Sequence, residues 1–125
     1  MPEGRCNCAS IKISIPEIPN ESAICYCGNC RRAGSTPGSI VYSYDRDQVR
    51  IDDAKGALKT YTDSDTTSGN TIFRQFCGNC GCPVASLLAM DAPKIILKGG
   101  LFDHLPKPGA TSFPQNQPEW LDIKA

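Results

Sequence analysis

The sequence has little histidine and no excess of charge of either sign. His104 is the only histidine, and the 13 Lys and Arg residues balance the 13 Asp and Glu residues. Proteins that bind nucleic acid usually carry a basic excess, because contacts to phosphate supply much of their affinity. We therefore expect no nucleic-acid partner for this chain.

Long apolar runs are also missing. No stretch approaches the roughly 20 apolar residues that a membrane-spanning helix needs. Residues 1–6 lack the apolar segment of a secretory signal. We therefore expect no membrane partner and a cytoplasmic location, where cysteine thiols stay reduced.

Helical patterning is absent as well, whereas strand patterns are frequent. No window repeats its apolar residues every 3.6 positions, and no helix cap stands out. We expect strands at residues 11–15, 39–44, 49–51, 58–62, 71–76, 84–90 and 94–97. These patterns predict an all-β fold, and the length of 125 residues predicts one domain covering 1–125.

Aromatic residues and prolines complete this expectation. The sequence predicts an irregular proline-rich segment at residues 106–118, after which Trp120 packs the tail onto the body. Four aromatic side chains are expected in the core: Tyr42, Tyr61, Phe73 and Phe76.

Cysteine is the feature that the sequence has in abundance. The eight cysteines fall into three clusters, which are Cys6-x-Cys8, Cys25-x-Cys27-x-x-Cys30 and Cys77-x-x-Cys80-x-Cys82. Two cysteines at i and i+2 of a strand point the same way, and a Cys-x-x-Cys pair can chelate a metal from a turn. Zinc takes four tetrahedral thiolate ligands. In a reducing compartment such cysteines indicate metal ligands before disulfides.

The spacing alone leaves several arrangements open. Eight thiolates could form two complete zinc sites, or one complete and one incomplete site. A disulfide framework and a thioredoxin-like redox pair are the alternatives, although no βαβ pattern surrounds either Cys-x-x-Cys.

The order and spacing of these clusters resemble those of the glutathione-dependent formaldehyde-activating enzyme family. The matching stretches are Cys6-Asn7-Cys8, Cys25-Tyr26-Cys27-Gly28-Asn29-Cys30-Arg31-Arg32 with Gly34, Leu58-Lys59-Thr60-Tyr61, Phe76-Cys77-Gly78-Asn79-Cys80-Gly81, Gly100-Leu101-Phe102-Asp103 and Pro118-Glu119-Trp120. The resemblance covers nearly the whole chain and implies a β-tent fold with zinc between short antiparallel strands.

The resemblance also implies which cysteines share a metal. Cys6, Cys8, Cys77 and Cys80 correspond to a closed structural zinc site. Cys25, Cys27 and Cys30 correspond to the three ligands of a catalytic zinc, whose fourth position takes the thiol of glutathione. The implied activity is that of a carbon–sulfur lyase acting on S-hydroxymethylglutathione.

Several residues depart from the family pattern or leave their roles open. Ala9 stands where glycine is usual, Tyr26 where histidine is common, and Cys82 where serine or threonine is usual. Cys82 is therefore either an idle thiol or the ligand that closes the second site. Asp103 and His104 could act as acid or base, but surface positions are the simpler interpretation.

Two residues are expected to act on the substrate. Tyr26 could donate a hydrogen bond to a developing alkoxide, with packing as its alternative role. Arg31, next to Arg32, could hold a glutathione carboxylate through two hydrogen bonds, with solvent exposure as the alternative.

Three thiolates suit this chemistry for an electrostatic reason. They leave a net charge of −1 on zinc and its ligands, which makes the metal a poor activator of water. A fourth thiol still loses its proton on binding, so it is nucleophile in forming a C–S bond and leaving group in breaking it. The sequence thus predicts a zinc-dependent carbon–sulfur lyase that uses a small-molecule thiol and an electrophile. A zinc scaffold that binds a protein partner is the alternative.

Overall fold

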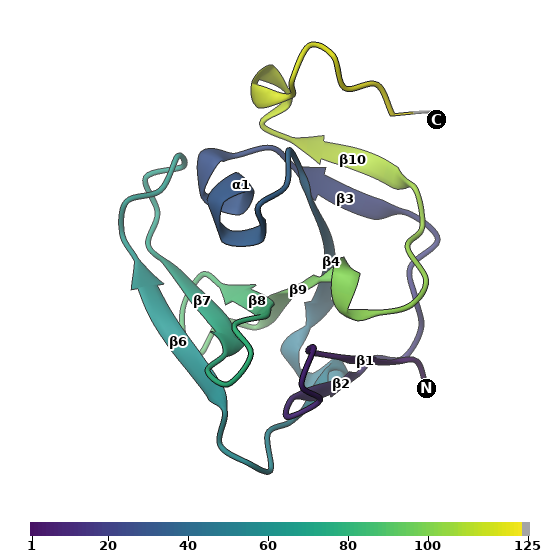
Figure 1. Cartoon of the computed structure of the whole chain (residues 1–125), viewed down its shortest axis with the longest axis vertical. Coiled ribbons are helices and arrows are strands. Elements are labelled where there is room, and N and C mark those ends of the chain that lie inside the picture. The colour runs from purple at the N-terminus through teal and green to yellow at the C-terminus, as the bar shows by residue number, and fades with distance from the viewer. Residues whose placement is uncertain (124–125) are drawn as a thin grey trace.

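The computed structural model describes residues 1–123 and contains two β-sheets with one short α-helix (Figure 1). The strands are β1 (Glu3–Arg5), β2 (Lys12–Ser14), β3 (Ser22–Cys25), β4 (Ser39–Asp45), β5 (Arg50–Asp52), β6 (Leu58–Asp63), β7 (Ile72–Cys77), β8 (Pro83–Leu87), β9 (Lys94–Lys98) and β10 (Pro108–Ser112). The helices are α1 (Gly28–Gly34) and the 3₁₀ turns η1 (Arg46–Gln48), η2 (Gly99–Leu101) and η3 (Pro114–Asn116). The predicted all-β class is confirmed. Within residues 1–123, the helices fall short of the length and apolar character that crossing a membrane requires.

The two sheets differ in size and share one cluster of buried side chains. The smaller sheet has the strand order β1-β2-β5, and the larger has the order β10-β3-β4-β9-β8-β7-β6. Neighbouring strands are antiparallel except for the parallel pair β10 and β3. Ile13 of β2 is fully buried in the same cluster as Tyr42 and Leu97 of the larger sheet.

The two faces of the larger sheet carry different residues. Tyr42 lies opposite Leu97, and Leu97 lies opposite Ala85, so these three side chains share the core face. Because side chains alternate along a strand, the adjacent pair Val41 and Lys98 lies on the other face. Helix α1 covers that face (Figure 1). Polar side chains on this face of the sheet, such as Lys98, therefore lie next to α1.

Helix α1 corrects the expectation that the chain has no helix. It begins after Cys27, whose Sγ accepts a hydrogen bond from the backbone N–H of Cys30 at 3.2 Å. It ends at Ser35, which takes the left-handed conformation with φ of 51°. The helix has only seven residues, too few to show a 3.6-residue period, and a thiol replaces the usual hydroxyl or carboxylate cap.

The C-terminal region and two aromatic residues also differ from expectation. Residues 108–112 form the edge strand β10 instead of irregular chain, because their backbone pairs with β3 although their sequence shows no apolar alternation. Trp120 is 77% exposed and does not pack onto the body. Tyr61 is 60% exposed on edge strand β6. Tyr42 is buried as predicted, whereas Phe73 packs against the core partly buried.

Candidate metal centres and the cavity between their strands

Four cysteines from distant parts of the sequence come together in one group. The Sγ atoms of Cys6, Cys8, Cys77 and Cys80 lie within 4.8 Å of one another. Cys6 and Cys8 are separated by 3.7 Å between sulfurs, and Cys8 and Cys77 by 3.6 Å. A tetrahedron with Zn–S bonds of about 2.3 Å has edges of about 3.8 Å. The group therefore fits a four-thiolate metal site, and its cysteines are free thiols.

The backbone around this group is shaped to present the sulfurs. The N–H of Ile11 donates to the Sγ of Cys6 at 3.4 Å, and the N–H of Cys80 donates to the Sγ of Cys77 at 3.5 Å. A hydrogen bond with Ser10 lowers the pKa of the Cys8 thiol to about 5. Backbone N–H groups that donate to sulfur favour the thiolate form that a metal needs.

A second group contains three cysteines. Cys25 lies at the end of β3, Cys27 caps α1 and Cys30 lies in its first turn, with their Sγ atoms within 4.8 Å of one another. The hydrogen bond with Cys30 lowers the pKa of Cys25, and the same contact raises the pKa of Cys30. These three thiols could hold a metal ion and would leave one tetrahedral position to another ligand.

The three thiols open onto a cavity of about 210 Å³, here called the thiol cavity. One wall is apolar and comes from Val41, Ile72, Ile96 and Phe113. Polar residues line the rest of it, and they include Asn29, the segment 66–68, Ser112, Arg74 and Lys98. A ligand bound to the three thiols would therefore meet two cations.

Asn29 holds one polar wall of the thiol cavity in place. Its buried Nδ2 donates to the Oδ2 of Asp63 at 3.0 Å and to the carbonyl of Asp65 at 2.8 Å. Its Oδ1 accepts from the N–H of Thr67 at 3.1 Å. Asp63 in turn accepts from the Nε of Arg74 at 2.6 Å, and this ion pair lowers the pKa of the Asp63 carboxyl. The network joins α1, β6 and β7 around the cavity.

Lys98 is the other cation of the thiol cavity. It lies at the end of β9 directly opposite Val41, and its Nζ donates to the Oγ of Ser39 at 3.1 Å. Among residues 1–123, no carboxylate forms an ion pair with it. Burial lowers the pKa of the Lys98 ammonium, and the nearby Cys30 thiol opposes that shift.

Neither Lys98 nor Arg74 was identified from the sequence. Arg74 lies within an expected strand and Lys98 directly follows one, and an isolated cation at such a position gives no functional signal by itself. Cross-strand register is what brings them together, since Lys98 and Ile96 are two apart on β9, Ile96 faces Ser86, and Ser86 faces Arg74. This pairing can be recognised only when the order of the strands in the sheet is known.

The structure places the two expected substrate-contacting residues outside the thiol cavity. Tyr26 follows Cys25 and points to the opposite face, where its ring lies next to Gly38 and it is 2% exposed. Arg31 is exposed on α1. Neither side chain lines the cavity.

The remaining candidate residues are members of neither cysteine group, although Cys82 lies next to the four-cysteine group and contacts Cys80. The Sγ of Cys82 accepts from the N–H of Asn7 at 3.3 Å and belongs to neither group within the described residues. Asp103 and His104 are exposed, and the carbonyl of His104 accepts a hydrogen bond from the hydroxyl of Tyr42. These positions favour an idle Cys82 over one that closes the three-cysteine group.

Comparisons with known proteins agree with this arrangement. Residues 1–117 match the family model described as glutathione-dependent formaldehyde-activating enzyme. No functionally curated protein matches the chain. A crystal structure of a structural-genomics protein from Rhodobacter sphaeroides is similar in fold, with a TM-score of 0.61 and 18% identity. The alignment covers 82% of this chain and 89% of that one.

Proposed function

The chain belongs to the glutathione-dependent formaldehyde-activating enzyme family, and on that premise we propose that it is a zinc-dependent carbon–sulfur lyase. Its substrate is glutathione, or the adduct of glutathione or a similar thiol with an aldehyde or another small electrophile. Cys6, Cys8, Cys77 and Cys80 form its structural zinc site, and Cys25, Cys27 and Cys30 form its catalytic one.

The observation that carries this proposal is the difference between the two cysteine groups. The first has four sulfurs, which complete a tetrahedron with no further ligand. The second has three, and they line a cavity large enough for a small ligand. A zinc ion held by Cys25, Cys27 and Cys30 would supply a position at which a substrate thiol binds in its deprotonated form.

The protein's own side chains then determine how the substrate lies. The apolar wall at Val41, Ile96 and Phe113 excludes water from one side of the thiols. Arg74 keeps its terminal guanidinium nitrogens for the substrate while its Nε is held by Asp63. Those nitrogens suit a carboxylate, since charge-assisted hydrogen bonds of arginine to carboxylates are strong and directional. We assign to Arg74 the role that the sequence suggested for Arg31.

Lys98 is placed to act on the electrophile. Its ammonium lies beside the three thiols and keeps donors free beyond the one given to Ser39. When a thiol sulfur adds to a carbonyl carbon, negative charge develops on the carbonyl oxygen. A donor fixed in a water-poor site stabilises that charge more than water does. In the reverse direction the same donor holds the hydroxyl oxygen as the C–S bond breaks.

A metal-substitution experiment tests the proposal. Protein loaded with cobalt in place of zinc is titrated with glutathione, and the thiolate-to-cobalt absorption is recorded. We expect a new sulfur ligand at one of two metals. S-methylglutathione, which has no thiol proton to lose, should produce no such change. Formation of S-hydroxymethylglutathione from glutathione and ¹³C-formaldehyde is then measured by NMR exchange against the uncatalysed rate.

Two results would contradict the proposal. A cobalt spectrum that glutathione leaves unchanged would mean that the second site is already closed and that the protein is a scaffold. A spectrum that changes without any acceleration of the exchange would mean that the protein binds the thiol but is not a lyase.

A further inference from the structure

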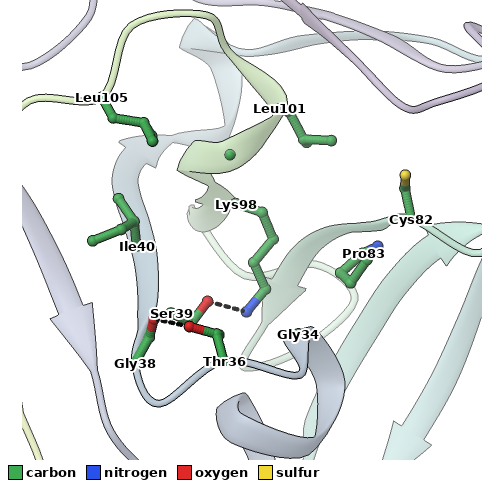
Figure 2. A pocket seen from close by; sticks show the side chains of 11 residues that line it. Gly34, Thr36, Gly38, Ser39, Ile40, Cys82, Pro83, Lys98, Leu101 and Leu105 are labelled. Atoms are coloured by element: carbon green, nitrogen blue, oxygen red, sulfur yellow. Dashed lines mark hydrogen bonds between the residues drawn. The ribbon is translucent and has the colours of Figure 1, made fainter.

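A second cavity of about 300 Å³ shares Lys98 with the thiol cavity as a lining residue and is here called the Lys98 cavity. Figure 2 shows the Lys98 side chain in its middle, between Ile40 and Pro83, with its Nζ bonded to Ser39. Leu101 and Leu105 lie at the end of the cavity away from Ser39. Most of the side chains that line it are apolar, and among the described residues Lys98 is the one that brings a charge to it.

Strand register places the two cavities next to each other. Ser39 of β4 lies directly opposite Cys25 of β3, so both side chains project from the same face of the sheet. Directly opposite residues in an antiparallel pair have Cβ atoms about 4.5–5.5 Å apart. Ser39 lines the Lys98 cavity and Cys25 lines the thiol cavity. The lining of the Lys98 cavity therefore begins about one strand spacing from Cys25, on the same face of the sheet.

The size and character of this cavity bear on the substrate. Its volume is about ten times the volume of about 30 Å³ that one water molecule occupies in the liquid. Formaldehyde, with a single carbon, would leave most of it empty. Ligand pockets are commonly lined by apolar residues with a few placed polar groups, which here are Lys98, Ser39 and Thr36.

Resting on the function proposed above, we propose that the Lys98 cavity holds the carbon chain of the electrophile, and that the preferred electrophile is an aldehyde with an apolar chain of several carbons. The chain lies against Ile40, Leu101 and Leu105. The carbonyl oxygen accepts a hydrogen bond from Lys98 at the boundary of the two cavities. The thiol occupies the polar thiol cavity on the other side of that boundary.

The reaction balances with these two substrates alone. The thiol sulfur forms a bond to the aldehyde carbon, and the C=O double bond becomes a single bond. The proton that the thiol loses ends on the former carbonyl oxygen, giving a hydroxyl. The reverse reaction breaks the C–S bond and returns that proton to the thiol.

The test uses the zinc-loaded full chain with glutathione and straight-chain aldehydes of one to six carbons. Each methylene buried should raise kcat/KM about fourfold until the cavity is full. Gly100 lines the cavity, and no neighbouring atom lies within 4 Å of the point where a Cβ on this residue would stand. The Cβ of Gly100→Phe therefore meets no neighbour, and we expect the ring to occupy the cavity, abolish the gain with chain length and leave turnover of formaldehyde intact.

A matched pair of leucines controls for general surface effects. Leu105 is 53% exposed and lines the cavity, whereas Leu88 is 61% exposed and does not. Leu105→Ala should lower the preference for long aldehydes severalfold, and Leu88→Ala should not.

A binding measurement tests the same cavity without depending on turnover. Butanamide, whose carbonyl does not react with thiols, should shift the methyl NMR signals of Ile40, Leu101 and Leu105 but not that of Leu88.

The outcomes separate this inference from the proposed function. Turnover of formaldehyde with a flat or falling chain-length profile, unaffected by Gly100→Phe, would overturn the chain-binding role and leave the lyase standing. Butanamide shifts that miss the cavity methyls would overturn it as well. Absence of turnover with every aldehyde would overturn the proposed function, on which this inference rests.

Discussion

The side-chain amide of Asn29 donates a hydrogen bond of 3.0 Å to the carboxylate of Asp63, which links the first turn of α1 to the end of β6. Both residues are buried, and Asp63 also pairs with Arg74. These polar contacts therefore connect α1, which carries two of the three cysteines, to β6 and β7 at one edge of the larger sheet. This link explains how so short a helix can stand over the sheet in a fixed position.

Replacing Asn29 tests that link. Asn29→Ala removes the side-chain partner of the Asp65 carbonyl and of the Thr67 N–H, and removing such a partner costs about 1–3 kcal/mol. We expect a loss of this size in the free energy of unfolding of the metal-loaded protein. Asn79 occupies the same position in the other Cys-x-x-Cys turn but is exposed. Asn79→Ala should cost less, and equal losses would show that the buried network contributes nothing special.

The ion pair between Asp63 and Arg74 should make stability depend on acid pH. The folded protein holds the pKa of Asp63 below its ordinary value of 3.8, so the unfolded chain takes up protons first as pH falls. The stabilisation is complete above the ordinary pKa and is lost as pH falls through the folded pKa. The difference in unfolding free energy between wild type and Asp63→Asn should thus be constant above about pH 5 and shrink below it.

The exposed pair of Lys94 and Asp45 is the matched control for that measurement. Its side chains are more than half exposed, and pairs of this kind contribute roughly 0–1 kcal/mol. Asp45→Asn should change stability little at any pH. A difference for Asp63→Asn that does not vary with pH would contradict the role of the ion pair.

The sequence predicts seven of the ten described strands and the cysteine spacings for physical reasons, and it misses β1, β3 and β10. Alternating residues such as Ile11, Ile13 and Ile15 face one buried side, and a local pattern reports burial directly. The Cys-x-Cys and Cys-x-x-Cys spacings also encode local geometry. Tertiary structure brings Cys6 and Cys8 together with Cys77, so spacing alone does not predict this group. The family resemblance implies it.

The cavity residues could not be predicted in the same way. Lys98, Ser39 and Cys25 come together through the register of three strands whose order the sequence does not encode locally. The expected roles of Tyr26 and Arg31 rested on their nearness in sequence to the cysteines. Adjacent residues on an extended chain point to opposite faces. Tyr26 directly follows Cys25, and its side chain therefore points away from the cavity.

Ala9 gives a prediction about stability. It has a φ of 62°, in the left-handed region that L-residues other than glycine adopt at a cost of roughly 1–2 kcal/mol. Glycine reaches this conformation freely but loses more entropy on folding. We expect Ala9→Gly to raise the free energy of unfolding by up to about 1 kcal/mol, measured by denaturant titration. Ala33 lies in α1, so Ala33→Gly should lower it. Changes of the same sign would contradict the strain at Ala9.

The two cysteine groups should respond differently to mutation. The metal-loaded protein is expected to hold two zinc ions per chain, by elemental analysis. Cys77→Ser should lose one zinc and most of the fold, because a structural zinc contributes folding free energy directly. Cys30→Ser should lose the other zinc and keep the fold, as judged by its NMR spectrum. Equal unfolding by both substitutions would contradict the division into structural and catalytic sites.

Lys98 provides the sharpest test of how the site works. Lys98→Met keeps the length and apolar stem of the side chain but removes the ammonium. If that ammonium stabilises the oxygen of the reacting carbonyl, kcat should fall on the order of 100-fold, while binding of glutathione to the cobalt-loaded protein stays unchanged. Lys94→Met changes a lysine on the same strand that is exposed and away from both cavities, and its kcat should equal that of wild type. Tyr26→Phe should also leave kcat near the wild-type value, because the buried Tyr26 ring lies next to Gly38 and does not line the thiol cavity. A Lys98→Met protein with normal kcat but weaker glutathione binding would instead place Lys98 on the thiol side of the boundary. A large loss in Tyr26→Phe would restore the role that the sequence suggested for that hydroxyl.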